Sequence, residues 1–288
     1  MTVDIVICVH NALRDVQKCV KSIYAAQIAY PYRVIVVDDY SAEPTKKFVR
    51  DYTTNDKNKI LVAHKERRNI GYTKSANLGL KASTADVVIL LNSDTIICKA
   101  TVHKLLESLY SDEKVGIAGP MSNAAGEQSI PTTERTAQNT AINRLPPGVN
   151  IEQMDEHCNT WSANHPFPEV NLIHGFCMAI KREVIERLSY FDELLFTHGY
   201  GEENDYCFRA RAAGFKLVVA THAFVYHEKS KSYSNQEKRS ALMAKGIQAL
   251  TSKYGAELKH TIKELKNNLE LRRIRTKAQV LWKPKKRN

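Results

Sequence analysis

The sequence has little that would anchor it in a membrane or export it. None of its apolar runs approaches the roughly 18 residues that a membrane-spanning helix needs. The N-terminus, Met1 to Ile5, has no basic segment ahead of an apolar one, so it predicts a first strand rather than a signal peptide. We therefore expect a cytoplasmic protein, either free or peripheral on the inner face of the membrane.

Short, paired cysteine spacings are also missing. The six cysteines are scattered, and most of them stand in apolar or helical patterns. This distribution is typical of reduced packing residues and argues against a zinc site made of cysteines. The chain has 288 residues, of which 43% are hydrophobic, so it can bury a substantial core as one large domain or two small ones.

Strands and helices alternate over the first two-fifths of the chain. This alternation predicts parallel βαβ units with right-handed crossovers, and hence an α/β fold with a nucleotide-binding half-sheet. The phosphate-binding loops Gly-x-Gly-x-x-Gly and Gly-Lys-Ser/Thr are absent, so a cation is the obvious candidate to hold the phosphates of a nucleotide. The apolar periodicity predicts strands over 3–9, 32–37, 60–63, 87–91 and 115–118, and helices over 14–29, 44–52, 72–82 and 99–110.

Residues 120–170 interrupt this rhythm. They are rich in Asn, Thr, Pro and Gln, which predicts a long irregular excursion over the sheet. Beyond it, a helix is expected to end at about Ala213, with Gly214 as its stop. The remaining predicted elements are strands over 172–180, 216–219 and 223–226, a helix over 182–188, and helices from about 235 onward.

The net charge of +11 is concentrated in the last 30 residues. From Lys259 to Asn288 there are eleven Lys or Arg against two Glu, a net charge of +9. A tail of this charge could bind nucleic acid or an anionic membrane. The rest of the chain is nearly neutral and has no motif for reading nucleic acid, so we do not expect nucleic acid as a partner. The apolar residues of the tail fit a helix lying on a bilayer or a helix that packs or oligomerises, and both readings stay open. They are Leu265, Leu269, Ile274, Val280, Leu281 and Trp282.

One short stretch organises the chemistry. Five apolar residues, 87–91, read as a strand buried on both faces, and Asn92, Ser93 and Asp94 follow it. Ligands of open α/β sheets bind beyond the carboxyl ends of such strands, where a carboxylate can hold a divalent cation against a phosphate. The alternative is a turn that caps the next helix.

Six segments in order resemble a family 2 glycosyltransferase with the GT-A fold. The resemblance covers roughly residues 3–230 and leaves the basic tail outside. It implies a Rossmann-like, mixed but mostly parallel sheet flanked by helices, followed by a C-terminal basic helical extension. The segments are residues 5–11 (Ile-Val-Ile-Cys-Val-His-Asn), 36–41 (Val-Val-Asp-Asp-Tyr-Ser), 69–79 (Asn-Ile-Gly to Leu-Gly), 91–95 (Leu-Asn-Ser-Asp-Thr), 201–209 (Gly-Glu-Glu to Arg) and His227.

The resemblance also implies a donor site. His10 would place a flat ring under the nucleotide base, and Asp38 or Asp39, with Asp39 preferred, would accept the imide N–H of uracil or thymine, or ribose hydroxyls. Lys74 could neutralise the diphosphate. The full set of implied donor-site residues is Cys8, Val9, His10, Asp38, Asp39, Asn69, Gly71, Lys74, Asn77, Asn92, Ser93, Asp94 and Gly175.

By the same resemblance, Asp94 and His227 would bind Mn²⁺ or Mg²⁺, and imidazole suits Mn²⁺ better. Glu203 would be the base that takes the proton of the acceptor hydroxyl, with Glu202 or Asp205 as alternatives. The family usually has Glu-Asp where this chain has Glu-Glu. These acids could instead favour a helix N-terminus, or pair at i, i+4 as Asp205 and Arg209 do in sequence.

The expected function is therefore inverting transfer of a hexosyl or deoxyhexosyl group from a UDP- or dTDP-sugar to a hydroxyl of a glycan or lipid-linked glycan. Residues 1–120 would bind the donor, 121–232 would form the acceptor-binding and catalytic half, and 233–288 the extension. Trp161, His198 and Tyr200 are candidates for stacking on sugars. The rivals are a nucleotidyltransferase, although 11–14 lacks the Gly-rich basic loop that it would need, and a non-catalytic module that binds a nucleotide-sugar or an anionic surface.

Overall fold

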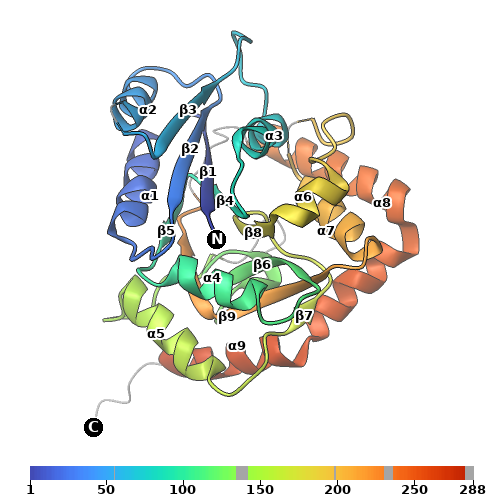
Figure 1. The fold of residues 1–288 in the computed structure, drawn as a ribbon. Coiled ribbons are helices and arrows are strands. Elements are labelled where there is room, and N and C mark those ends of the chain that lie inside the picture. Colours follow the sequence, from blue (N-terminus) through green and yellow to red (C-terminus); the bar gives the residue numbers. More distant parts are fainter. Residues whose placement is uncertain (55, 134–141, 198, 230–235, 283–288) are drawn as a thin grey trace.

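The computed structural model describes residues 1–54, 56–133, 142–197, 199–229 and 236–282. They form a nine-stranded mixed sheet with helices on both faces (Figure 1). The path of the sheet is β3-β2-β1-β4-β8-β6-β9-β5, and β7 pairs with β9 beside this path. The α/β class and the mixed, mostly parallel sheet expected from the sequence are confirmed.

The N-terminal half is the predicted series of parallel βα units. Its strands are β1 (Val3–Val9), β2 (Tyr32–Asp38), β3 (Lys59–Ala63) and β4 (Val87–Asn92), and its helices are α1 (Leu13–Ala25), α2 (Thr45–Thr53) and α3 (Tyr72–Ala82). Alternate residues of β1 enter two different cores: Ile5 and Ile7 pack with α1 on one face, and Val6 packs with α3 on the other. Burial on both faces explains why these strands are apolar without interruption.

The second half completes the sheet with both strand directions. It contains β5 (Thr95–Ile97), α4 (Thr101–Leu109), β6 (Val115–Ser122), the 3₁₀ turn Gly126–Gln128, α5 (Ile151–Ser162), β7 (Glu169–Val170), β8 (Cys177–Lys181), α6 (Arg182–Leu188), α7 (Glu202–Ala212) and β9 (Lys216–His227). Strand β8 runs antiparallel to β4 and β6, whereas β9 is parallel to β6 and antiparallel to β5.

Three predictions for this half were wrong. Residues 120–170 are not one irregular excursion, because β6 continues to Ser122 and a capping box between Asn150 and Gln153 starts α5; residues 134–141 lie outside the described part. The strand predicted over 172–180 is confined to Cys177–Lys181. The two strands predicted over 216–226 are one 12-residue strand, and a register irregularity opposite β6 lies between the two parts that were recognised.

The C-terminal residues fold onto the same core. Helix α8 (Gln236–Asn267) is broken at Gly255, where φ is 51°, and α9 (Leu269–Trp282) follows it. Of the apolar side chains that could have served a bilayer, Leu265 and Ile274 are buried in the core, whereas Leu269 and Val280 are exposed. The apolar stripe is thus largely used for packing within the protein.

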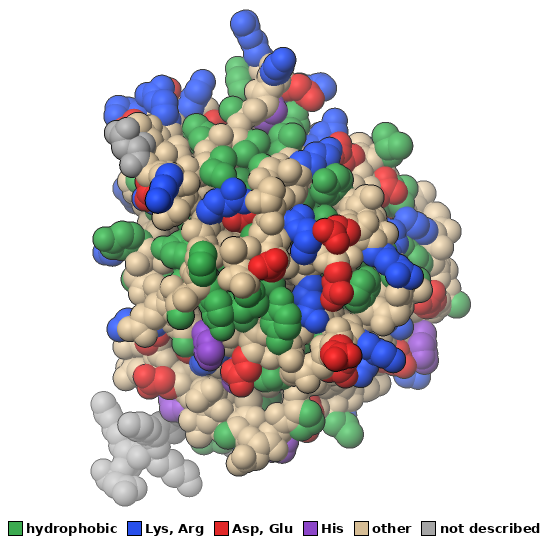
Figure 2. Space-filling model, viewed as in Figure 1, with side chains coloured by type: hydrophobic (Ala, Val, Ile, Leu, Met, Phe, Trp, Pro, Cys, Tyr) green, Lys and Arg blue, Asp and Glu red, His purple; other side chains and the backbone are tan. Residues whose placement is uncertain are grey.

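The described helices include none with the length and apolar character needed to cross a membrane. On the face shown in Figure 2, basic and acidic side chains are interspersed, and no extended surface of one sign is visible there.

The sheet brings three predicted segments together. In the parallel register, Cys8 of β1 lies opposite Asn92 of β4, and Val9 lies opposite Asp38 of β2. The residues that follow these strands therefore share one edge of the sheet, as expected for ligand sites of open α/β folds.

Candidate functional site

Asp39, at the end of β2, is an organising carboxylate. Its side chain is 4% exposed. It accepts hydrogen bonds from the backbone N–H groups of Ile70 (2.7 Å) and Gly71 (2.9 Å), from Nδ2 of Asn69 (2.9 Å) and from Nε2 of His64 (3.1 Å). Gly71 has φ of 89°, which favours glycine, and starts α3. Asp39 and Asn69 therefore fix the loop that leads into α3.

His10 and Asp38 lie beside this carboxylate. Nδ1 of His10 is 2.7 Å from the carbonyl oxygen of Asp39, which can only accept, so this nitrogen carries a proton. Nε2 of His10 is 3.1 Å from Nδ2 of Asn11, which fixes the ring further. Oδ1 of Asp38 accepts the N–H of Ser41 at 3.2 Å. The structure thus places both residues at the predicted sheet edge, with the His10 ring held in one orientation.

The end of β1 forms the buried floor of the site. Val9 is 1% exposed. The pKa of the Cys8 thiol is raised by burial and by the charges of Asp39 and Glu202. The Tyr72 hydroxyl donates to the carbonyl of Gly175 at 3.4 Å, and burial raises its pKa as well. The Cys8 thiol and the Tyr72 hydroxyl therefore keep their protons and stay uncharged at neutral pH.

The two predicted donor residues of α3 differ in their surroundings. Asn77 is 1% exposed. Its Nδ2 donates to the Phe191 carbonyl (2.9 Å) and to Oε1 of Glu193 (2.8 Å), and its Oδ1 accepts the Phe191 N–H (3.0 Å). Its amide therefore holds the segment after α6, and its contact with the donor stays a prediction. Lys74 is half-buried in the first turn of the helix.

Asp94 and His227 meet where β5 pairs with β9. Thr95 lies opposite His227 in this antiparallel pair, and the N–H of Glu228 donates to the Asp94 carbonyl at 2.9 Å. Oδ1 of Asp94 is 3.2 Å from Nε2 of His227, and the two side chains are 13% and 7% exposed. The structure thus brings Asp94 and His227 together, and their role as metal ligands stays a prediction.

The turn that carries Asp94 is fixed by backbone contacts. The Asn92 N–H donates to the Phe176 carbonyl at 2.9 Å, and the Asn92 carbonyl accepts the Thr95 hydroxyl at 2.6 Å. Ser93 is half-buried in the turn between β4 and β5. The side chain of Asp94 is thus directed by a short, tightly bonded connection.

The orientation of His227 depends on a residue that sequence reasoning missed. Oδ1 of Asn123 accepts the N–H of His227 (2.7 Å), and Nδ2 of Asn123 donates to its carbonyl (3.0 Å). Nδ1 of His227 is 3.1 Å from the Ala124 carbonyl, and the ring of Phe176 stacks on the imidazole at 5.5 Å. The only sequence signal was the polar pair Ser122-Asn123 at the end of β6.

These contacts make the pair suitable for a metal ion. Because a carbonyl can only accept, Nδ1 of His227 carries a proton, and in the neutral ring Nε2 presents its lone pair to Asp94. Histidines that bind metals commonly donate the other ring N–H to a carbonyl in this way. Two acceptors 3.2 Å apart require a proton or a cation between or beside them. Among the residues that the structure describes, no group of three or more His, Cys, Asp or Glu side chains is arranged to hold a metal ion.

Glu202 and Glu203 open α7 after a segment of unusual backbone. Gly199, Tyr200 and Gly201 have φ of 100°, 70° and 125°. Glu202 is 4% exposed, and its Oε2 has no hydrogen-bond partner within the described residues. Burial, followed by the charge of Glu203, raises the pKa of Glu202 well above its ordinary value.

Glu203 is half-buried beside Gly175. A Cβ added to Gly175 would lie 3.2 Å from Cβ of Glu203, so glycine leaves room for this side chain. Oε2 of Glu203 accepts the N–H of Gly201 at 3.3 Å. Gly175, which the sequence assigns to the donor site, therefore lies against the side chain of Glu203.

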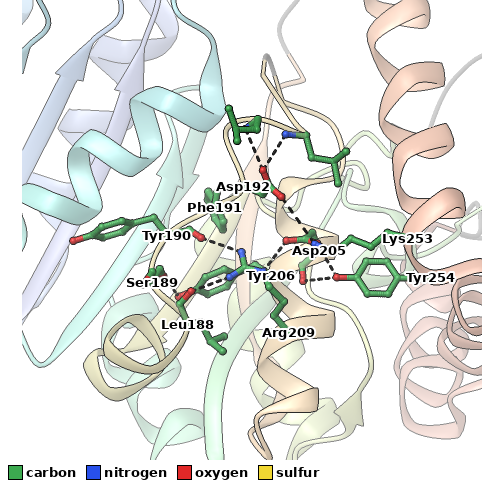
Figure 3. Close-up of polar contacts among 12 residues, drawn as sticks. Leu188, Ser189, Tyr190, Phe191, Asp192, Asp205, Tyr206, Arg209, Lys253 and Tyr254 are labelled. Carbon is green, nitrogen blue, oxygen red and sulfur yellow. Dashed lines mark hydrogen bonds and ion pairs between the residues drawn. The ribbon is translucent and has the colours of Figure 1, made fainter.

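Asp205 makes ionic contacts with residues of α7 and α8 (Figure 3). It is fully buried, with Nζ of Lys253 at 2.6 Å, the Tyr254 hydroxyl at 2.7 Å and Nε of Arg209 at 2.8 Å. Burial alone would raise its pKa, but the hydrogen bonds from Lys253, Tyr254 and Arg209 outweigh burial and lower it. The i, i+4 pair with Arg209, which the sequence offered as the alternative to catalysis, is present.

His174 forms a further wall beside Gly175. Its N–H donates to Oε1 of Gln128 at 2.8 Å. Gly126, with φ of 53°, leaves room for the imidazole, because a Cβ there would lie 2.2 Å from Nε2. Arg275 of α9 donates to the Glu127 carbonyl at 2.7 Å and so supports this loop. The sequence analysis did not single out His174.

The three residues predicted to stack on sugars lie in different surroundings. The Trp161 ring stacks on His157 at 5.5 Å and packs against the core, which favours a packing role. Tyr200 is half-buried at the segment before α7. His198 lies outside the described residues.

The family model described as glycosyl transferase family 2 matches residues 4–189. Chondroitin synthase of Escherichia coli is 26% identical over 248 residues, covering 78% of this chain and 34% of that protein. An N-acetylglucosaminyltransferase of Bradyrhizobium elkanii is 31% identical over 123 residues, covering 41% of this chain and 64% of that protein. The chain thus spans about a third of the length of the chondroitin synthase.

Two solved structures share the fold. GalNAc-T7 with UDP, GalNAc and Mn²⁺ has a TM-score of 0.64 at 14% identity, with 97% of this chain and 54% of that chain covered. The mannosyltransferase PcManGT of Pyrobaculum calidifontis with GDP-Man and Mn²⁺ has a TM-score of 0.55 at 17% identity, with 97% and 84% covered.

Proposed function

Because the chain belongs to glycosyl transferase family 2, we propose that it transfers a hexosyl or deoxyhexosyl group from a UDP- or dTDP-sugar to a hydroxyl group, with inversion of the anomeric carbon. The observation that carries this proposal is the Asp94–His227 pair, 3.2 Å apart at the carboxyl edge of the sheet. Both solved relatives named above hold a nucleotide and Mn²⁺.

The donor nucleotide would lie over the ends of β1, β2 and β4. His10 presents a ring of fixed orientation to the base, and Asp38 is the carboxylate assigned to the base or ribose. Asp39 would support the donor site indirectly, because its carboxylate oxygens already accept hydrogen bonds that hold the loop 64–71. Lys74, in the first turn of α3, would neutralise charge on the diphosphate.

Asp94 and His227 would hold a divalent cation, with Mn²⁺ favoured over Mg²⁺ by the imidazole ligand. When bound, this cation would neutralise charge on the leaving nucleoside diphosphate. Phosphate oxygens and water would complete its coordination, since two protein ligands leave most positions open. Asn123 and Ala124 keep Nε2 of His227 directed at the site.

Glu203 would accept the proton of the attacking hydroxyl. Glu202 is the weaker candidate, because its raised pKa means that it keeps its own proton at higher pH. Asp205 is committed to Lys253, Tyr254 and Arg209. A base on one side of the anomeric carbon and the leaving group on the other give a single displacement, and hence inversion.

The acceptor is proposed to be a glycan, either free or carried on a lipid. Chondroitin synthase and hyaluronan synthase of Pasteurella multocida are among the relatives, at 26% and 24% identity over 74% of this chain. Residues 1–120 would bind the donor, 121–232 the acceptor, and the extension 233–288 would pack on both. Attraction of its exposed Lys and Arg to an anionic membrane would rest on charge, because only Leu269 and Val280 of its apolar stripe are exposed.

The test is turnover with a panel of UDP- and dTDP-sugars in the presence of Mn²⁺, with oligosaccharide acceptors and with water alone. The anomer of the first product is read by proton NMR before it equilibrates. We expect a β product from an α-linked donor, and loss of turnover in Asp94→Asn. A product with retained configuration would refute the inversion, and nucleotide binding without any turnover would favour a binding module. In a separate reaction with a nucleoside triphosphate and a sugar 1-phosphate, formation of an NDP-sugar and pyrophosphate, without transfer from any NDP-sugar, would indicate a nucleotidyltransferase.

A further inference from the structure

The segment that carries the acidic pair rests on one stripe of α8. Gly246 contacts Tyr200, Leu250 contacts Gly201, and Lys253 with Tyr254 contacts Asp205. The spacing of these α8 residues is that of one helix face. The stripe lies in the C-terminal extension, beyond the residues 4–189 that the family model matches.

Gly246 permits the closest of these contacts. A Cβ at this position would lie 1.7 Å from the carbonyl oxygen of Tyr200 and 3.4 Å from its Cβ. Any other residue would push the Tyr200 backbone away from α8 by more than an ångström. Tyr200 already has φ of 70°, and it stands two residues before Glu202.

One turn further along, Leu250 closes over Gly201. A Cβ added to Gly201 would meet Cδ1 of Leu250 at 3.2 Å and Cε1 of Phe196 at 2.7 Å. Leu250 is 3% exposed, so this contact belongs to the core. With φ of 125°, Gly201 turns the chain into α7 directly under this side chain.

The ionic cluster around Asp205 ties α7 to α8 and to the turn after α6 (Figure 3). Asp205 accepts from Lys253 and Tyr254 of α8, whereas Arg209 bridges it to the carbonyls of Leu188 and Tyr190, both at 3.0 Å. The Tyr254 ring also stacks on Phe208 of α7 at 4.0 Å. The first turn of α7 is thereby held on both sides.

We propose that α8 is a positioning element of the active site, in which Gly246 and the Asp205–Lys253–Tyr254 contacts set the place of Glu203. This rests on the proposed role of Glu203 as the base. The donor site is built from the ends of β1, β2 and β4 and does not contact this stripe through the residues named. Disturbing the stripe therefore lowers kcat while nucleotide affinity stays unchanged. A displacement of about 1 Å at a reacting group can cost roughly 100-fold in rate.

The test uses two variants of the full chain and a control. Gly246→Ala displaces Tyr200, and the milder Tyr254→Phe removes one hydrogen bond to Asp205 but keeps the ring stack. Gly255→Ala is the control, because it strains the helix break where φ is 51° and its Cβ meets no described atom within 4 Å. The readouts are kcat, the UDP dissociation constant with Mn²⁺, and hydrogen–deuterium exchange of the segments 199–205 and 92–95.

We expect Gly246→Ala to lower kcat by about 10- to 100-fold and to speed exchange at 199–205 but not at 92–95, with UDP affinity within twofold of wild type. Tyr254→Phe shows the same pattern on a smaller scale, and Gly255→Ala shows neither change. Unaltered kcat and exchange in Gly246→Ala, or in Tyr254→Phe if the first variant does not fold, would overturn the inference. If wild type turns over no donor, the proposed function fails, whereas the exchange data still decide whether α8 holds the segment.

Discussion

Asn123 offers a sharp test of how the Asp94–His227 pair is held. Its amide is 1% exposed and clamps both the N–H and the carbonyl of His227, at 2.7 and 3.0 Å. In Asn123→Ala, both backbone groups lose these partners inside the protein, and the imidazole loses its anchor. Both stability and metal affinity should therefore fall.

The size of each effect follows from these contacts. A buried polar group left without its partner costs about 1–3 kcal/mol, so two such groups give a loss of about 2–6 kcal/mol. For a chain of this size, that corresponds to a fall in Tm of roughly 3–10 °C. Removing a residue that orients a metal ligand commonly costs about 10- to 100-fold in metal affinity.

Asn143→Ala is the matched control. Nδ2 of Asn143 donates to the carbonyls of Asn123 and Thr132, both at 3.0 Å, so this variant also loses two hydrogen bonds in the same region. Thermal unfolding and calorimetric titration of Mn²⁺ in the presence of UDP would be compared for the two variants. Equal Mn²⁺ affinity in both would refute the reasoning that Asn123 acts through His227.

Four further variants test the other carboxylates. Glu203→Gln should lower kcat by about 10²- to 10⁴-fold with little change in UDP affinity; a near-wild-type rate would exclude this residue as the base. Because the pKa of Glu202 is raised, wild type loses stability as pH rises from the ordinary value of 4.5 through the folded-state pKa. Urea unfolding should therefore show the free energy of unfolding of Glu202→Gln increasing relative to that of wild type over this range. A difference that stays constant with pH would contradict the shift. The lowered pKa of Asp205 gives stability that is present above 3.8 and lost as pH falls through the folded-state pKa; at pH 7, Asp205→Asn should cost about 3–5 kcal/mol in the same assay. Asp39→Ala should release the loop 64–71 and weaken nucleotide binding, and unchanged hydrogen exchange in that loop would argue against its organising role.

The sequence predicted best the parts whose apolar pattern is local. The bounds of β1 and α3 agree with the expectation to the residue, because burial on two faces makes the strand uniformly apolar and Gly71 marks the helix start. Helix α5 was missed, since its capping box and its two most deeply buried apolar side chains, Met154 and Cys158, stand among many polar residues.

The sequence predicts a set of candidate site residues but not the contacts among them. Asp94 and His227 are 133 positions apart in the numbering of the chain, and only the pairing of β5 with β9 brings them together. Nothing local in the sequence shows that Phe191 takes up the amide of Asn77. The partners of Asp205 are equally distant, since Lys253 lies on α8.

The most direct test of the central claim is the effect of Mn²⁺ on nucleotide binding. UDP and dTDP would be titrated against wild type, Asp94→Asn and His227→Gln, with and without the metal. At a ligand concentration of 100 times Kd, binding adds about 2.7 kcal/mol, or roughly 5 °C in Tm. We predict a rise of this size in wild type that needs Mn²⁺ and is lost in both variants. A rise that is independent of Mn²⁺, or a rise with anionic lipid or nucleic acid and none with any nucleotide, would contradict the account.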